Sequence, residues 1–270
     1  MSDHAAQRNF VEATGARVIG GVRYLGGMAI LLGQAISATK ATLARGSGRQ
    51  ALAGQMVRVG VRSVGIVCLV QIFIGVILAL QLAPPLEPWG QVDKIANIIG
   101  VAGFRMLGPI LTAVVISGFA GASIAAELGT MVVAEEIEAL QAHALNPVRF
   151  LVVPRLLATF IMMILLTIIA NWMIAVGGYA TALLVLEPKV TEGYWTLMRD
   201  QLRLRDFASG LIMAGVFGVL ISLIACYEGL RVRGGAEGVG KATTMTVVYS
   251  IVSIILAAGV FTTIFYVFGF

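Results

Sequence analysis

An all-α integral membrane protein is the fold class that the sequence predicts, and two observations support it. The chain is 59% hydrophobic and only 12% charged, with a mean hydropathy of +0.93, which is too apolar for a soluble domain. Five stretches also lack Asp, Glu, Lys and Arg, and each reaches the roughly 20 residues with which a helix crosses a bilayer core of about 30 Å. These stretches are residues 63–86, 106–126, 156–186, 207–227 and 242–270.

Five transmembrane helices are therefore expected, several of them extended by flanking apolar residues. The third charge-free stretch would measure about 46 Å as a helix rising roughly 1.5 Å per residue. Because that exceeds one bilayer, we expect it to tilt, to bend near Gly177 and Gly178, or to project beyond the membrane. The expected spans are about residues 63–86, 95–126, 150–186, 207–228 and 242–268.

The basic residues indicate how these helices are oriented. Eight Lys and Arg precede the first span, two lie between the second and third spans, and three lie between the fourth and fifth. The loops on the opposite side carry five. Because basic residues accumulate in cytoplasmic loops, the N-terminus is expected in the cytoplasm and the C-terminus outside it. Topology thus explains the pI near 9.5, which gives no support for nucleic-acid binding.

The N-terminal region, residues 1–54, differs from the rest of the chain. Residues 1–16 are expected to be a polar tail, and residues 44–55 a small, polar link into the first span. Between them, apolar residues recur every three or four positions, which predicts an amphipathic helix lying in the cytoplasmic interface. A sixth, weakly hydrophobic span is the alternative. The repeating residues are Val22, Leu25, Met28, Leu32 and Ile36.

Polar side chains are rare within the first two spans, so each one indicates a protein-lined position. Gln71 and Gln81 are expected to face protein or a cavity rather than lipid. Arg105 lies inside the second span, where a charge is costly; it is either functional or extends its side chain to the outer interface. Small residues spaced by four, which allow close helix approach, follow at Ser117, Gly121 and Ala125 and at Gly118, Ala122 and Ala126.

An acidic cluster separates the second and third spans. Its neighbouring apolar residues have helical spacing, and a helix there is expected to end at Asn146-Pro147. The cluster is either a solvated loop helix or a docking helix that transmits force from a soluble partner. Its acidic residues are Glu127, Glu135, Glu136 and Glu138, and the apolar ones are Leu128, Met131, Val132 and Leu140.

No enzyme activity, metal site or cofactor is expected from this sequence. Residues 235–242, GAEGVGKA, approach the phosphate-binding pattern G-x-x-x-x-G-K-[ST], but Ala242 replaces the hydroxyl and no strand precedes the motif. Cys68 and Cys226 lie in apolar runs, as small core residues do. The two histidines are isolated and have no metal-ligand spacing.

Three segments of the chain nevertheless resemble a known family. FIGVILALQ at residues 73–81, LGPILTAVVISGFAGASIAAELGTMVVAEEIEAL at 107–140 and NPVRFLVVPRLLA at 146–158 are similar to the MlaE/YrbE permeases. GGAEGVGKATTMTVV at residues 234–248 resembles that family's second signature. The resemblance covers about residues 55–270, an MlaE-type permease domain, and the family's five spans behind an interfacial helix agree with the number counted above.

Several expectations follow from this resemblance alone. It implies a homodimer in the bacterial inner membrane, a separate ABC ATPase and a ring of MCE-domain proteins on the outer side. Residues 127–140 would form the coupling helix, with Glu127, Glu135, Glu136, Glu138 and Leu140 at the ATPase. A lipid cavity would be lined by Leu78, Leu82 and Trp89, with Arg105 and Met106 at its outer end.

This chain departs from the family pattern at three positions. Met106 replaces an acidic residue, which makes the expected cavity less polar, and Phe119 and Val133 replace basic residues. The predicted function is a permease subunit that moves phospholipid or a related lipid to or from an MCE conduit, driven by ATP bound to another subunit. A sterol or other hydrophobic-lipid importer of the same family, or a membrane scaffold without transport, are the alternatives.

Overall fold

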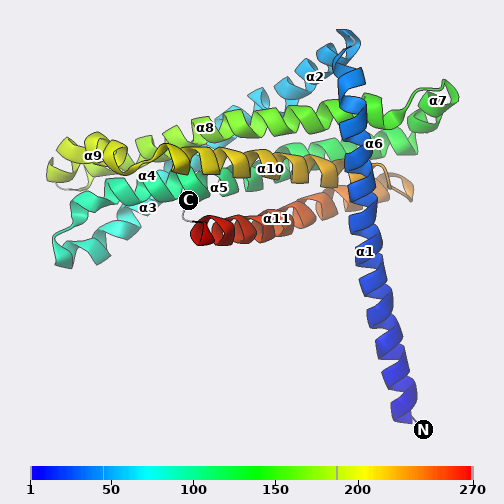
Figure 1. Ribbon diagram of the computed structural model, residues 1–270, viewed down its shortest axis with the longest axis horizontal. Helices are drawn as coiled ribbons and strands as arrows, with labels where there is room; N and C mark the ends of the chain where they lie inside the picture. Colours follow the sequence, from blue (N-terminus) through cyan, green and yellow to red (C-terminus); the bar gives the residue numbers. More distant parts are fainter. Residues whose placement is uncertain (1, 45, 187, 269–270) are drawn as a thin grey trace.

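The computed structural model describes residues 2–44, 46–186 and 188–268, which form helices joined by short turns (Figure 1). This confirms the all-α fold class. By length and composition, six helical stretches of the described chain could cross a membrane, so the N-terminal helix counts as a sixth candidate. They are Ile19–Leu43, Gly46–Trp89, Val92–Val133, Val148–Leu184, Leu204–Gly229 and Gly235–Val267.

Apart from Ile19–Leu43, these stretches run back and forth through one bundle (Figure 1). The short helix α7 (Glu136–Ala142) lies at one end and α9 (Pro188–Gln201) at the other, and we call these the α7 end and the α9 end. The helix α9 was not expected from the residue pattern. The bundle helices are α3 (Val64–Leu86), α4 (Ile95–Ala102), α5 (Gly108–Ile116), α6 (Ala122–Val133), α8 (Val153–Leu184), α10 (Leu204–Gly229) and α11 (Gly235–Val267).

Two clusters of buried apolar side chains hold the bundle together. The larger one lies where α5, α6, α8 and α10 meet, around Met163, Phe217 and Ile221. The smaller one lies toward the α9 end, around Ile99 and Tyr194. Burial of large apolar side chains such as these stabilises a fold by about 1.5–3 kcal/mol each relative to water, although contact with lipid reduces that gain in a membrane.

The second span is one continuous path of helix with two π-helical segments in it. The first, η4 (Gly103–Leu107), joins α4 to α5, and the second, η5 (Ser117–Gly121), joins α5 to α6. A third π segment, η6 (Val148–Val152), leads into α8. Such segments are rare and occur often at functional sites, and η4 contains both Arg105 and Met106.

Glycines bring α3 and α8 into close contact. A Cβ atom on Gly177 would meet the carbonyl oxygen of Ile72, and one on Gly75 would meet that of Ile174. Only glycine permits backbones to approach in this way, as is common between membrane helices. The helix α8 continues without a break through Gly177 and Gly178, so these glycines provide the packing surface for a neighbouring helix.

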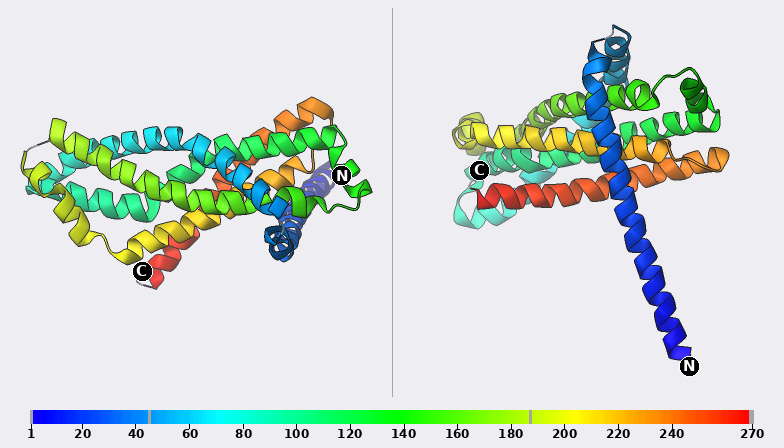
Figure 2. Two further views of the ribbon diagram at one scale, coloured as in Figure 1. Left: turned by 90° about the horizontal axis from the view of Figure 1, so that it is seen from above. Right: turned by 45° about the vertical axis from the view of Figure 1, so that its right-hand side comes forward.

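The N-terminal helix α1 (Ser2–Leu43) crosses the bundle at a steep angle and extends away from it (Figures 1 and 2). Two expectations were wrong here. Residues 2–16 are helical rather than a loose tail, and most of the expected link lies in another helix, α2 (Gly46–Val59). Both segments contain at least three Ala residues and no Pro, which favours helix over loop.

The apolar stripe expected on α1 mostly points away from the bundle. Val22 is 66% exposed and Ile36 62%, whereas Met28, Leu31 and Ala35 are buried against the other helices. The exposed part of the stripe is therefore available to lipid.

The acidic segment is two helices rather than the single helix that was expected. The helix α6 ends at Val133, Glu135 has a φ of 58°, and α7 begins at Glu136. A left-handed residue cannot continue a right-handed helix, and the backbone N–H of Glu135 closes the turn by donating to the Val132 carbonyl oxygen at 3.1 Å. The second helix ends at Ala142, before Asn146-Pro147.

Candidate functional sites at the two ends of the bundle

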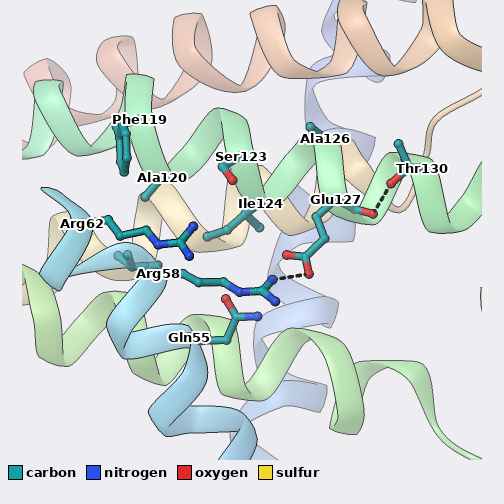
Figure 3. Close-up of a pocket in the computed structure, with 11 residues that line it drawn as sticks. Gln55, Arg58, Arg62, Phe119, Ala120, Ser123, Ile124, Ala126, Glu127 and Thr130 are labelled. Atoms are coloured by element: carbon teal, nitrogen blue, oxygen red, sulfur yellow. Dashed lines mark hydrogen bonds and ion pairs between the residues drawn. The ribbon is translucent and has the colours of Figure 1, made fainter.

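A cavity of about 540 Å³ lies near the α7 end (Figure 3). Arg58 and Arg62 reach into it from the junction of α2 and α3, and the opposite wall comes from η5 and α6. The wall is partly apolar, so the cavity combines cationic and hydrophobic surfaces. Its lining residues are Gln55, Arg58, Val59, Arg62, Phe119, Ala120, Ser123, Ile124, Ala126, Glu127 and Thr130.

One carboxylate and two guanidinium groups form the charged cluster at this cavity. An Nη1 atom of Arg58 lies 2.7 Å from Oε1 of Glu127, and Nη2 of Arg155 lies 3.0 Å from Oε2. The Arg155 side chain is only 4% exposed, whereas those of Arg58 and Glu127 are 55% and 35% exposed. Both oxygens of Glu127 are therefore used to neutralise arginines, one of them buried.

This cluster joins three separate elements of the fold. Arg58 lies in the last turn of α2, Glu127 in α6 and Arg155 at the start of α8. Arg155 is held in place because its Nη1 also donates to the Leu151 carbonyl oxygen at 2.8 Å. The backbone that leads to the acidic helix α7 is thus tied to α2 and to α8.

A second cavity of about 530 Å³ lies toward the α9 end and is more apolar. Arg105 and Met106 line it, together with Ile98, Val101 and Ala102 of the preceding helical turns and with Asn97, Leu107 and Gln201. Such a volume falls within the range of roughly 300–1,000 Å³ that is usual for small-molecule sites. One guanidinium group thus lies beside an apolar wall.

Arg105 contacts two neighbours from other helices. Its Nη1 lies 3.5 Å from Oδ1 of Asp206, and its guanidinium carbon lies 5.7 Å from the centre of the Phe265 ring. Asp206 is only 8% exposed, and its other oxygen, Oδ2, accepts a hydrogen bond from the backbone N–H of Arg203 at 3.1 Å. The carboxylate therefore caps the start of α10 and pairs with Arg105 at the same time.

The structure does not place all the expected cavity residues together. Arg105 and Met106 line the α9-end cavity, but Leu78 and Leu82 lie half-buried against the smaller core cluster. Trp89, just beyond α3, is 78% exposed. Leu78 and Leu82 do share one side of α3, as their spacing predicted.

The expected coupling residues also divide into two groups. Glu127 lies inward, in the charged cluster of the α7-end cavity. Glu135, Glu136 and Glu138 are exposed, and Leu140 is half-buried. Three carboxylates thus project from the α7 end, where a soluble partner could reach them.

The two glutamines of the first span differ in exposure. Gln71 is fully buried, and its Nε2 donates to Oγ1 of Thr112 at 3.0 Å, so it faces protein as predicted. Gln81 is exposed on the surface of this chain. Residues 235–242, which approached the phosphate-binding pattern, form the first turns of α11.

Sequence reasoning missed the partners of the two membrane arginine sites. Arg58 and Arg155 were counted only as topology signals, and Asp206 only as a loop charge. A signal was available in the sequence: Glu127 ends one span and Arg155 begins the next, so both lie at the same membrane surface. The same signal existed for Arg58, which precedes the first span on the side of Glu127, and for Arg105 and Asp206, which each directly precede a charge-free stretch. It places each pair at one membrane surface but does not show which helices are neighbours.

A bundle of long apolar helices with an arginine-lined cavity toward each end is the architecture of a polytopic membrane protein. The chain belongs to the MlaE permease family, since that family's model, described as Permease MlaE, matches residues 52–264. This confirms the resemblance seen in the three sequence segments.

Named relatives agree with the family assignment. A probable ABC transporter permease protein of Rickettsia felis is 37% identical over 212 residues, which cover 78% of this chain and 82% of that protein. The intermembrane phospholipid transport system permease protein MlaE of Haemophilus influenzae is 32% identical over 202 residues, 74% of this chain and 76% of that one. The chloroplastic protein TRIGALACTOSYLDIACYLGLYCEROL 1 of Arabidopsis thaliana is 33% identical, over 78% of this chain and 60% of its own length.

Proposed function

We propose that this protein is the membrane subunit of an ABC transporter that moves phospholipid to or from an MCE-protein conduit, with ATP hydrolysed by a separate subunit. The observation that carries the proposal is the α9-end cavity, where Arg105 and Met106 meet an apolar wall. The family assignment supports it, because one relative is named for phospholipid transport.

The cavity suits an amphipathic lipid on chemical grounds. A guanidinium group donates strong, charge-assisted hydrogen bonds to a phosphate, and these are stronger where water is scarce. The apolar wall would accept the first part of the acyl chains. Because Leu78 and Leu82 lie on another part of the surface, we infer that a second copy of the chain, in a homodimer, brings them toward the same lipid.

The acidic residues at the α7 end suit a docking surface for an ATPase subunit. Glu135, Glu136 and Glu138 are exposed at the α7 end, and Glu127 ties the adjacent helix to α2 and α8. Force applied to α7 would therefore reach the bundle through a fixed charged cluster. We infer that Leu140 adds an apolar contact to the same docking surface.

The steep crossing of α1 supports a place in the membrane plane rather than across it (Figures 1 and 2). With five spans and cytoplasmic basic loops, the C-terminus lies on the periplasmic side of the inner membrane. A reporter that is active only in the cytoplasm should be silent at the C-terminus. A C-terminal reporter that is active there would contradict this topology of five spans with a periplasmic C-terminus.

Mass spectrometry of lipid that co-purifies with the protein tests the proposed substrate. Arg105→Ala should lower the amount of bound phospholipid, because the headgroup loses its cation. Arg205→Ala is the matched control, since Arg205 is an exposed arginine near the start of α10 that does not line the cavity.

Two results would contradict the proposal. If Arg105→Ala keeps its full phospholipid content, Arg105 has only a structural role with Asp206, and a neutral, sterol-like substrate becomes the better hypothesis. If neither the wild-type protein nor the control retains any lipid, the protein is better explained as a membrane scaffold.

A further inference from the structure

We propose that the α7-end cavity binds the phosphate group of an anionic lipid, with Arg58 and Arg62 as its ligands. This second lipid site lies at the opposite end of the bundle from Arg105. It goes beyond the proposed transport function and does not depend on it, because a bound lipid here could be a fixed component of the structure or a transported molecule.

The first argument is the charge around the cavity. Arg58, Arg62 and Glu127 are the charged side chains among the residues that line it, and the buried Arg155 lies directly behind Glu127. Three guanidinium groups therefore surround one carboxylate. Since both oxygens of that carboxylate already face arginines, a net positive charge remains in the cavity.

The second argument is the arrangement of the two ligand side chains. Arg58 and Arg62 are four residues apart at the junction of α2 and α3, and both guanidinium groups extend into the same cavity (Figure 3). The Nη1 atom of Arg58 forms an ion pair with Glu127. None of the ion pairs within the described part of the chain includes Arg62. The planar fork of arginine suits the oxygens of a phosphate.

The third argument distinguishes a lipid from a soluble phosphate. Part of the remaining wall of the cavity is apolar and includes Phe119, which is 43% exposed, and the buried Ile124. A free phosphate ion would gain nothing from these side chains, whereas the glycerol and first acyl carbons of a lipid would cover them.

The position of the cavity along the chain agrees with a lipid headgroup. Arg62 immediately precedes the charge-free residues 63–86, and Glu127 immediately follows the charge-free residues 106–126. Both charged residues thus lie where apolar helices leave the hydrocarbon layer, at the depth of the headgroups.

Native mass spectrometry of the full chain in nanodiscs tests this site without any ATPase. The nanodiscs contain phosphatidylcholine with a minor fraction of phosphatidylglycerol, and the bound lipids are counted after mild release. We expect Arg62→Gln to weaken phosphatidylglycerol binding about tenfold, the factor that corresponds to 1.4 kcal/mol. Arg49→Gln is the matched control, because Arg49 is an exposed arginine of α2 that does not line the cavity.

A second variant tests the cavity without changing its charge. Ser123→Phe places a large side chain into the space between α6 and the two arginines, and it should displace the anionic lipid as strongly as Arg62→Gln does. Because Ser123 and Arg62 are both exposed, neither change removes a core contact.

Three outcomes would overturn the proposal. Equal loss in Arg62→Gln and Arg49→Gln would show general attraction to an anionic surface, and unchanged binding in Ser123→Phe would place the lipid elsewhere. Displacement of the lipid by inorganic phosphate would show a soluble-anion site. Failure of the Arg105 experiment would leave this result unaffected, because the two cavities are separate.

Discussion

The two ends of the helix bundle use the same chemical pair, an arginine and a carboxylate beside a cavity, in different ways. At the α9 end, the carboxylate of Asp206 is the buried partner, and Arg105 lies 3.5 Å away with 29% of its side chain exposed. At the α7 end, the arginine is the buried partner, and Glu127 serves two arginines at 2.7 and 3.0 Å.

The difference shows at which end of the bundle the stability of the fold depends on the ion pair. Asp206 keeps a backbone hydrogen bond at the start of α10 even without Arg105. Arg155 would lose its only carboxylate among the described residues if Glu127 were removed, and its Nε already has no hydrogen-bond partner there. A buried charge without a counter-charge is strongly unfavourable. The α7 end should therefore be the more sensitive to substitution.

Glu127→Ala should have the largest effect on stability. It leaves the guanidinium of Arg155 buried without its counter-charge, which typically costs 3–5 kcal/mol; because Glu127 is 35% exposed, we expect about 3 kcal/mol. Thermal or denaturant unfolding in detergent measures this loss. Glu127→Gln keeps an oxygen for one hydrogen bond, so its free energy of unfolding should fall by less. An unchanged unfolding midpoint in Glu127→Ala would show that water or lipid compensates the charge of Arg155.

Asp206→Ala should have an intermediate effect. It removes a helix-capping acceptor, worth about 1 kcal/mol, and a partly exposed ion pair worth at most about 1 kcal/mol. The same unfolding assay should therefore show a loss of about 1–2 kcal/mol. Asp206→Asn keeps the capping oxygen and should therefore retain most of the free energy of unfolding that Asp206→Ala loses. A loss equal to that of Glu127→Ala would remove the contrast between the two ends.

Glu135→Lys combined with Glu138→Lys should change stability least, by about 0.5 kcal/mol or less, because both side chains are exposed. It should, however, abolish the lipid-dependent stimulation of the ATPase in the reconstituted transporter, since complementary charge favours correct docking. Normal stimulation in the double variant would mean that the acidic helix is only a solvated loop. Glu87→Lys reverses a single exposed carboxylate at the α9 end and serves as the control, which should leave stimulation intact.

Much of the fold was accessible from the sequence because the membrane imposes simple requirements on a chain. Charge-free stretches had to become helices, and the five expected spans correspond to bundle helices. The break at Glu135 had no such signal, since no Gly or Pro marks it and the neighbouring apolar spacing is helical. The helix α9 lies in a charged loop, where length and hydropathy carry little information.

The candidate sites were less predictable than the fold. Arg105 stood out because a charge inside a span is rare, and it does line a cavity. Its partner Asp206 lies 101 positions later, and Arg58 lies 69 positions before Glu127. Pairing over such separations depends on how the helices pack, which spacing along one sequence does not reveal.

The π segments of the second span change the spacing of its buried residues. Buried residues along it come as adjacent pairs that repeat every four residues, with one step of five at η4, rather than every 3.6 residues as on a regular α-helix. On an unmodified α-helix each four-residue step would rotate the buried side by about 40°, and the wider π turns absorb part of that rotation. A search for paired small or apolar residues at a period of four would thus detect helices of this kind, which a search at 3.6 residues would overlook. The pairs are Ile95-Ala96, Ile99-Gly100, Gly103-Phe104, Gly108-Pro109, Thr112-Ala113, Ile116-Ser117, Ala120-Gly121, Ile124-Ala125 and Leu128-Gly129.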